Sequence, residues 1–327
     1  MEEASLIVIG SLHTDIVASG LKRFAKPGEL VRGKELVIGP GGKSRNIAAM
    51  AAALSPLNRV AMVGRTSQDP YGLWKVPFDA CREIGVNTDF VQVSSYEEAG
   101  KLPAITLIPV DQQGNNQILL LPGSSDDFSP ADLEAAEELF VAVKKNNGLL
   151  ALSLECPPEM LKYSVKKAYD MGIRVALDTG GIEDDTNLDD QYKYLYLIKP
   201  NEHEAQVLTG ITITDFDTAQ AAAKKFMDLG SQNVLITVGV NGAYFFTPDV
   251  QKHIPVPALP TSDIKDETGC GDQTMGALCA FLQEGKTLEE AAELAILAGS
   301  LQFNRQGIRP VRRDEIATAS SPQPNNQ

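Results

Sequence analysis

The sequence predicts an α/β protein with a mainly parallel, three-layer sheet and a small antiparallel β-sheet lid. Short apolar runs alternate with helical patterns of about 10 to 15 residues through the middle and C-terminal parts, which implies βαβ crossovers. The runs lack polar alternation, as is typical of strands covered on both faces. Nearer the N-terminus, other strand patterns break this rhythm and favour a second, separate sheet.

The predicted small sheet comes first along the chain. Residues 30–38 have the composition of a strand, and residues 105–110 and 117–121 flank a turn-rich segment, which predicts an antiparallel hairpin. Strands from about 15–38 and 103–121 would form a lid over the carboxyl ends of the main strands, where open α/β sheets bind ligands. The alternative is an edge extension of the main sheet with no ligand role.

The main sheet then begins to alternate with helices. Ser129 is a helix N-cap, followed by Pro130 at the first helical position and Asp132 in a capping box, so a helix is predicted to continue through 133–143. The apolar run 149–154 predicts a covered strand that ends at Glu155. Similar patterns predict helices at 159–171, 202–208 and 218–229, strands at 173–177, 194–198 and 234–238, and a hairpin turn at Asn241-Gly242 leading into 243–246.

Composition excludes several classes of protein. The 327 residues include 29 Lys and Arg against 43 Asp and Glu, and a net charge of −14 argues against a nucleic-acid binder. No apolar run approaches the roughly 18 to 20 residues of a membrane span, and the run 6–9 is too short for a signal peptide. Four cysteines without a CxxC pair suggest reduced thiols. We expect a cytoplasmic protein with one domain, 1–318, and a flexible tail, 319–327.

A glycine-rich turn at 266–272 is the most informative motif. Gly269, Cys270 and Gly271 lead into an amphipathic helix, so their N–H groups and the positive helix end would form an anion site. Asp272 in the first turn would lie beside that anion as a proton acceptor, which suggests phosphoryl transfer to an alcohol. Neither a Walker loop nor a GxGxxG fingerprint is present. The structural alternative is that Asp272 caps its helix and the glycines form a tight turn.

A second glycine cluster precedes the Ala-rich helix predicted at 47–54. Gly41 and Gly42 would let a ligand approach the backbone, and Lys43 and Asn46 supply a charge and an amide suited to hydroxyl groups. The motif therefore indicates a site for a sugar-sized polyol, with a structural turn as the alternative. Glu155 and the segment 199–204 lie at predicted strand ends, where α/β sheets place their sites.

Taken together, these segments resemble the ribokinase-like, or phosphofructokinase-B, family of carbohydrate kinases, and within it the ribokinases. The resemblance covers nearly the whole chain, in order. It rests on Gly10-Ser11 with Asp15, Gly41-Gly42-Lys43 with Asn46, Glu155, Asn201-Glu202-His203-Glu204, Thr237-Val238-Gly239, and 266–272.

The resemblance implies a role for each matching position. Asp272 would take the proton from the sugar hydroxyl, while Gly269, Cys270 and Gly271 hold the γ-phosphate of ATP. The implied sugar-binding residues are His13, Asp15, Gly41, Gly42, Lys43, Asn46, Glu155 and Asp272. Asn201 and Glu204 would order Mg²⁺, and Thr237, Gly239, Asn241 and Gly242, with Gly271, would bind the nucleotide. An activating K⁺ would lie at Asp266, Thr268, Gln302, Arg305 and Gly307.

Two departures from the family pattern concern the site. His13 stands where ribokinases usually have a sugar-contacting Asn, which bears on the identity of the sugar. Cys270 replaces a small Ala, and a thiol at a helix N-terminus can have a lowered pKa, so we hypothesise that its oxidation or alkylation inhibits the enzyme. The alternative is an inert residue that fills space.

The expected function is ATP-dependent phosphorylation of a primary sugar hydroxyl, with D-ribose to D-ribose 5-phosphate as the leading reaction. A nucleoside kinase, for adenosine for example, or a kinase for another sugar of the family is the alternative within the class. A non-catalytic ligand-binding regulator is the alternative from a different class, and retention of Asp272 argues against it. The apolar hairpin 105–121 would leave a sheet face uncovered, so we expect a homodimer through the lid strands.

Overall fold

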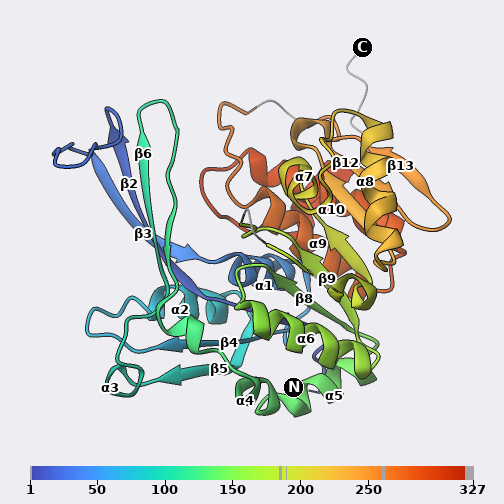
Figure 1. Ribbon diagram of the computed structural model, residues 1–327, viewed down its shortest axis with the longest axis horizontal. Helices are drawn as coiled ribbons and strands as arrows, with labels where there is room; N and C mark the ends of the chain where they lie inside the picture. The colour runs from blue at the N-terminus through green and yellow to red at the C-terminus, as the bar shows by residue number, and fades with distance from the viewer. Residues whose placement is uncertain (1, 184–185, 189, 260–261, 321–327) are drawn as a thin grey trace.

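The computed structural model describes residues 2–183, 186–188, 190–259 and 262–320, and within them the chain forms two sheets (Figure 1). The large sheet has the strand order β13-β12-β11-β10-β9-β8-β1-β4-β5. Its strands from β5 to β11 pair in parallel, and β12 and β13 add an antiparallel edge. The strands are β1 (Leu6–Ile9), β4 (Val60–Ser67), β5 (Asn87–Ser94), β8 (Leu149–Ser153), β9 (Arg174–Asp178), β10 (Leu197–Lys199), β11 (Val234–Thr237), β12 (Ala243–Phe246) and β13 (Gln251–Ile254).

Helices cover both faces of this sheet, because successive apolar side chains of each strand point to opposite faces. In β1, Ile7 and Ile9 belong to one core cluster, and Leu6 and Val8 belong to the other. The first face packs against α4 (Pro130–Glu134), α5 (Glu137–Lys145), α6 (Pro158–Asp170), α7 (Glu202–Thr209) and α8 (Phe216–Asp228). The second packs against α1 (Lys43–Leu54), α2 (Lys75–Glu83), α9 (Cys270–Gln283), α10 (Leu288–Phe303) and α11 (Arg313–Ser320). The three-layer α/β prediction is confirmed.

The small sheet is separate from the large one and has the order β3-β2-β6-β7. It consists of two antiparallel pairs, β2 (His13–Leu21) with β3 (Glu35–Gly41) and β6 (Ile105–Asp111) with β7 (Leu119–Leu121), joined by a parallel contact between β2 and β6. Figure 1 shows this sheet projecting from the body of the molecule beside α1. It is therefore not an edge extension of the main sheet.

Several predicted element boundaries were wrong. The strand predicted at 30–38 begins only at Glu35, because β2 pairs with β3 no further than Ser19 opposite Glu35. The single helix predicted after Ser129 is two helices, α4 and α5, separated by Ala135 and Ala136. Asp132 keeps its capping box and also binds Arg65 of β4, so α4 is fixed by an ion pair as well as by apolar contacts.

Other boundaries differ at the site and at the C-terminus. α1 begins at Lys43 rather than after Asn46, because the N–H of Asn46 donates to the Gly42 carbonyl and closes the first turn. The strand predicted at 194–198 is reduced to β10, preceded by a 3₁₀ turn at Gln191–Tyr194. Helix α11 includes the first two residues of the predicted tail, and residues 321–327 lie outside the described residues. None of the described helices is long and apolar enough to span a membrane.

Candidate active site

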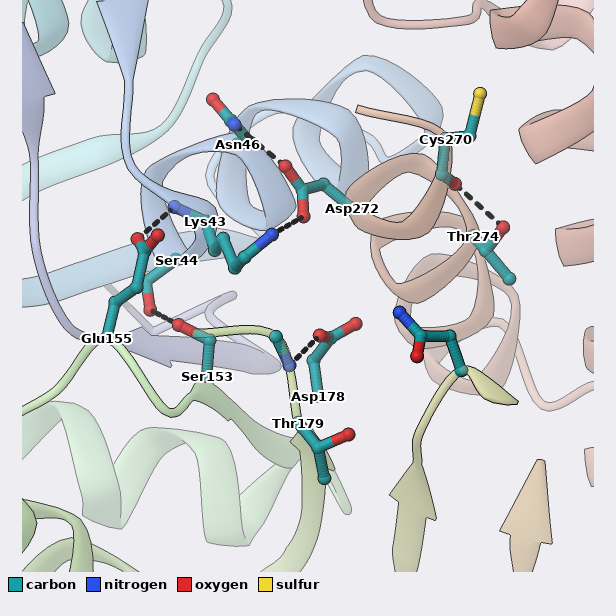
Figure 2. A network of polar contacts seen from close by, with 12 residues as sticks. Lys43, Ser44, Asn46, Ser153, Glu155, Asp178, Thr179, Cys270, Asp272 and Thr274 are labelled. Carbon is teal, nitrogen blue, oxygen red and sulfur yellow. Dashed lines mark hydrogen bonds and ion pairs between the residues drawn. The ribbon is translucent and has the colours of Figure 1, made fainter. Parts of the chain in front are cut away.

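The predicted motifs meet where β1, β8, β9 and β10 end and where α1 and α9 begin. Figure 2 shows Lys43 and Asn46 of α1 directed toward Asp272 of α9, with Glu155, Asp178 and Thr179 on the strand-end side. Parallel strands place their carboxyl ends at one edge of the sheet, and helix N-termini return to that same edge. Segments more than 200 residues apart thus form one site, as the contact between Asn46 and Asp272 shows.

Asp272 lies at the centre of this site. It is 6% exposed, its Oδ2 accepts a hydrogen bond of 2.8 Å from Asn46 Nδ2, and its Oδ1 lies 3.9 Å from Lys43 Nζ. Burial raises the pKa of the Asp272 carboxyl, and the charge of Lys43 and the Asn46 hydrogen bond act in the opposite direction. The Asp272 charge in turn raises the pKa of Lys43. The site therefore contains a buried carboxylate of increased basicity with one cation beside it.

The turn before Asp272 has the geometry of an anion site, with one difference from the prediction. Gly269 caps α9 in the left-handed region at φ 74°, which favours glycine. The N–H of Cys270 donates to the Glu267 carbonyl, so it is not free as predicted. In the described part of the chain, the N–H groups of Gly269 and Gly271 have no partner and remain available at the positive end of α9.

The Cys270 side chain does not have the reactivity that the sequence suggested. Figure 2 shows its thiol pointing away from Asp272, and Sγ lies 3.6 Å from the Asp266 carbonyl oxygen. Burial and the charges of Asp266, Glu267 and Asp272 raise the pKa of Cys270 to about 12. The expectation of a lowered thiol pKa was wrong, because burial and three nearby carboxylates outweigh the helix N-terminus, so the thiolate that reacts with oxidants and alkylating agents is scarce at neutral pH.

The predicted sugar-binding residues gather on the other side of Asp272. Glu155 Oε2 accepts a hydrogen bond of 2.7 Å from the Lys43 N–H and lies 3.9 Å from His13 Nδ1. Burial lowers the pKa of His13, which is 2% exposed. Burial also raises the pKa of Asp15 to about 6.

Two glycines allow the backbone to approach closely on this side. A Cβ on Gly41 would lie 2.1 Å from the Asp15 carboxylate oxygens, so only glycine fits there. Gly42 has φ 89°, and a Cβ on it would lie 2.9 Å from the Ser11 carbonyl oxygen. The GGK motif thus lets β3 turn into α1 directly beneath the acidic side chains.

The predicted Mg²⁺ residues lie at the N-terminus of α7. Asn201 and Glu204 form a reciprocal capping box, and Glu204 Oε2 also accepts a hydrogen bond of 2.8 Å from Thr179 Oγ1. Thr237 pairs with Asn201 through an isolated bridge, so β11 delivers the nucleotide segment to the same place. The Glu204 carboxylate is thus fixed in orientation. Such a group suits Mg²⁺, a hard cation that retains its waters and binds phosphates.

The predicted nucleotide segment forms a tight turn after β11. Gly239–Asn241 is a 3₁₀ turn, and Gly242 follows with φ 91°. A Cβ on Gly242 would lie 2.1 Å from the Ile254 carbonyl oxygen, so this position requires glycine. His253 of β13 interacts through Nε2 with the Asn241 carbonyl oxygen at 2.6 Å.

Four of the five predicted K⁺ residues converge. Asp266 Oδ2 accepts from the Gly307 N–H, and Gln302 Nε2 donates to the carbonyl oxygens of Thr268 and Gly307. Gln302 Oε1 is buried and has no hydrogen-bond partner in the part of the chain that the structure describes. An oxygen-rich donor set with an unpartnered buried oxygen fits a monovalent cation. The Arg305 side chain instead contacts Glu315 and the carbonyl oxygens of Arg309 and Pro310, so only its backbone could contribute.

Sequence reasoning gave no role to a buried ion pair next to the anion turn. Lys199 Nζ lies 2.7 Å from Asp178 Oδ2, and both side chains are less than 5% exposed. A Cβ on Gly271 would lie 3.7 Å from Lys199 Nζ, so this ammonium faces the start of α9. Burial acts to lower the pKa of Lys199, but the charges of Asp178 and Glu204 raise it above its usual value. A signal was present, because Asp178 directly follows the apolar strand residues 175–177.

The fold and site together define an α/β phosphotransferase that acts on an alcohol, and comparison with known proteins specifies the family. The pfkB family carbohydrate kinase model matches residues 3–313, so the chain belongs to this family and is an ATP-dependent sugar kinase. It is 31% identical over 318 residues to Bacillus subtilis ribokinase, covering 95% of this chain and 97% of the relative. It is 28% identical over 308 residues to Salmonella typhi deoxyribokinase, covering 93% and 94%.

A solved structure agrees with these sequence relatives. The structure of Arabidopsis thaliana ribokinase complexed with ribose and ATP superposes with a TM-score of 0.81 at 27% identity, covering 97% of this chain and 98% of that one. The ribokinase-like fold predicted from the motifs is confirmed.

Proposed function

We propose that this chain transfers the γ-phosphoryl group of ATP to the primary hydroxyl of D-ribose and forms D-ribose 5-phosphate. The observation that carries the proposal is the buried Asp272 carboxylate, held by Asn46 and Lys43 at the N-terminus of α9. Similarity to an A. thaliana ribokinase that was solved with ribose and ATP supports ribose as the acceptor.

Asp272 acts as the general base in this proposal. Its raised pKa brings its basicity closer to neutrality, which favours proton transfer in the transition state. As the sugar oxygen bonds to the γ-phosphorus, its proton passes to Asp272. The bond from that phosphorus to the bridging oxygen breaks, and ADP leaves with the electron pair. Asp272 afterwards releases the proton to solvent, so the reaction balances.

The turn at the start of α9 stabilises the transferring group. The N–H groups of Gly269 and Gly271 would donate hydrogen bonds to the phosphoryl oxygens, and the α9 dipole would add positive potential. The absence of a Cβ on Gly271 leaves room for those oxygens next to Lys199. Cys270 contributes its position in the turn, because its N–H is already bonded to Glu267.

The sugar hydroxyls bind to the acidic side chains and to α1. Asp15 and Glu155 accept hydrogen bonds from hydroxyl groups, and Lys43 donates one. His13 is neutral at pH 7, because burial lowers its pKa, so it offers one donor and one acceptor nitrogen. The lid strands β2, β3, β6 and β7 exclude water that would compete as the phosphoryl acceptor.

Asn201 and Glu204 would hold Mg²⁺, and the turn formed by Gly239, Asn241 and Gly242 would border the nucleotide together with Thr237. Mg²⁺ would neutralise charge on the phosphates of ATP. K⁺ would bind the oxygens of Asp266, Thr268, Gln302 and Gly307, next to the anion turn. The four free cysteines suit a reducing compartment, so we place the enzyme in the cytoplasm.

The other candidate acceptors are 2-deoxyribose and a nucleoside. Similarity to S. typhi deoxyribokinase supports 2-deoxyribose at a comparable identity. His13 stands where ribokinases usually have Asn. This difference supports an acceptor that differs from ribose near the His13 imidazole, such as a nucleoside with its base.

The test is ADP release with Mg-ATP and K⁺ across ribose, 2-deoxyribose, fructose, ketodeoxygluconate, adenosine and pseudouridine. We expect turnover with ribose that falls by at least about a hundredfold in Asp272→Asn, the usual contribution of a general base. The matched control is Asp228→Asn on the exposed face of α8, which should keep full activity. Turnover on adenosine alone would replace ribose by a nucleoside, and wild-type activity in Asp272→Asn would remove Asp272 from the mechanism.

A further inference from the structure

The side chain of Asn46 is bonded at both ends of its amide. Nδ2 donates to Asp272 Oδ2 at 2.8 Å, and Oδ1 accepts from Arg45 Nη1 at 2.9 Å. Arg45 and Asn46 are each 4% exposed, and Asp272 is 6% exposed. Water therefore has little access to replace either hydrogen bond, and the amide holds the carboxylate in place.

Only one orientation of the Asn46 amide satisfies both neighbours. A guanidinium group only donates hydrogen bonds, and an ionised carboxylate only accepts them. If the amide turned over, Nδ2 would face the Arg45 donor and Oδ1 would face Asp272. Both hydrogen bonds would become repulsive contacts, so the Arg45 donor selects the orientation in which Asn46 can donate to Asp272.

Arg45 is itself held by packing between two helices. It lies in the first turn of α1, and its side chain also interacts with the buried Cys81 thiol of α2. Within the described residues its Nε has no hydrogen-bond partner, which is an unfavourable arrangement for a buried guanidinium. Burying this group lowers the stability of the fold. Such costs are typical of functional sites, and here the functional contact is the hydrogen bond from Nη1 to Asn46.

We infer that Arg45 is a positioning residue, which fixes the amide of Asn46 so that Asn46 orients the Asp272 carboxylate for proton transfer. This inference rests on the proposed function of Asp272 as the base. With Oδ2 held by Asn46, Oδ1 of Asp272 stays directed toward Lys43 and is the oxygen free to take the hydroxyl proton. Arg45 itself touches neither of the reacting groups in this scheme.

Loss of the Arg45 contact changes the basicity of Asp272. The Asn46 hydrogen bond lowers the pKa of Asp272, so an amide free to turn over lets that pKa rise further. The other ionisable groups that act on Asp272 or respond to its charge are Lys43, Glu155, Asp178, Asp15, Lys199 and Cys270. All of them stay in place when Arg45 is changed to Met, but Asp15 also loses the Arg45 charge that lowers its pKa, and the Asn46→Ala background controls for this effect.

The test is a double-mutant cycle with Arg45→Met, Asn46→Ala and the double variant. We expect Arg45→Met to lower kcat about tenfold, the size of one lost hydrogen bond to a charged group. In the Asn46→Ala background the same change should alter kcat less than about twofold, because the group through which Arg45 acts is gone. A tenfold loss in both backgrounds would overturn the inference, since Arg45 would then act independently of Asn46.

A second readout does not require turnover. The Asp272 carboxyl carbon is titrated by ¹³C NMR in the ligand-free enzyme and identified by its disappearance in Asp272→Asn. We expect the midpoint to rise by about one pH unit in Arg45→Met and to change little between Asn46→Ala and the double variant. An equal rise in both backgrounds would show a charge effect alone and would overturn the inference.

Two further variants separate positioning from folding. Arg45→Lys can still donate to Asn46 Oδ1 and should recover most of the kcat, and failure to recover it with an unchanged Tm would count against the inference. Arg174→Met is the matched control, because Arg174 also has an unpartnered Nε but lies at the opposite end of the strands. It should leave kcat and the Asp272 midpoint unchanged. If the wild-type enzyme phosphorylates no acceptor, the proposed function fails while the titration still tests Arg45.

Discussion

At the scale of single residues, Asp15 combines a functional role with a cost in stability. Burial beside Gly41 raises its pKa to about 6, whereas the carboxyl has its ordinary pKa of 3.8 in the unfolded chain. Between these two pH values the native state binds a proton that the unfolded state does not, so the stability contributed by Asp15 falls as the pH rises. Above about pH 6 the full penalty is present, because the native protein then holds a buried charge.

Asp15→Asn should therefore raise Tm at pH 8 by a few degrees and raise it less at pH 4.5, where Asp15 is already mostly protonated in the native state. The same variant should weaken sugar binding, because an acceptor for hydroxyl groups is lost. Differential scanning calorimetry without sugar gives the two Tm values, and sugar titration by calorimetry gives the affinity. An equal change in Tm at both pH values would show that Asp15 carries no pH-dependent penalty.

At the scale of elements, two glycines at the start of α9 have different roles. Gly269 is required by the fold, and Gly271 is required by the proposed phosphoryl site. Gly269 needs its left-handed φ of 74°, and a Cβ there would lie 3.2 Å from Met50 Cε. Gly271 has ordinary helical backbone, and the nearest atom to its Cβ is Lys199 Nζ at 3.7 Å. A methyl group on Gly271 is thus tolerated by the fold but lies where the phosphoryl oxygens are proposed to bind.

We expect Gly271→Ala to keep Tm within about two degrees and to lower kcat by about a hundredfold, because a displaced phosphoryl group loses its hydrogen-bond donor. Gly269→Ala should lower Tm clearly, since an L residue with positive φ costs about 1 kcal/mol or more. Thermal unfolding and ADP release on both variants check the contrast. The assignment of Gly271 to the phosphoryl site would be rejected if Gly271→Ala retained wild-type turnover.

The sequence was sufficient to predict those elements whose signals are local. Capping boxes, apolar runs and the glycine turns at 41–42 and 269–271 located most of the strands and helices near the site. Boundaries set by partners were missed: β3 starts where β2 can pair with it, and α4 is anchored by Arg65 of a strand not recognised from sequence. These depend on residues far away in the chain.

The same distinction holds within the site. Asp272, Lys43 and Glu155 were predicted because each lies in a recognisable motif or at a strand end. The roles of Lys199, Asp178 and Arg45 were not predicted, since they depend on which side chains face each other across β9, β10, α1 and α2. The basicity of Cys270 was predicted in the wrong direction, because the largest cause of its raised pKa is burial, which the folded structure sets, and the nearby carboxylates add to it.

At the scale of the whole molecule, the small sheet leaves apolar side chains in solvent. Leu36, Val37 and Ile38 of β3 and Leu119, Leu120 and Leu121 of β7 are between 42% and 63% exposed. Two outer strands of this composition, in a sheet that stands away from the core as Figure 1 shows, form a surface that proteins normally cover. A second copy of the chain offers an identical sheet, and a two-fold axis would bring the two lids together.

We expect the protein to be a homodimer through these strands, with a mass twice that of the chain by light scattering at micromolar concentration. Leu36→Asp combined with Leu119→Asp should give a monomer, because the registers place both positions on one face of the small sheet, where their like charges would meet their counterparts across the axis. Val141→Asp, a comparably exposed apolar residue on α5, is the matched control and should remain dimeric. Contacts between the two lids would also hold each lid in place over the sugar. The monomeric variant should therefore have a raised KM for sugar, and its Tm should be largely retained. A wild-type chain that is monomeric at these concentrations would refute the lid-to-lid arrangement.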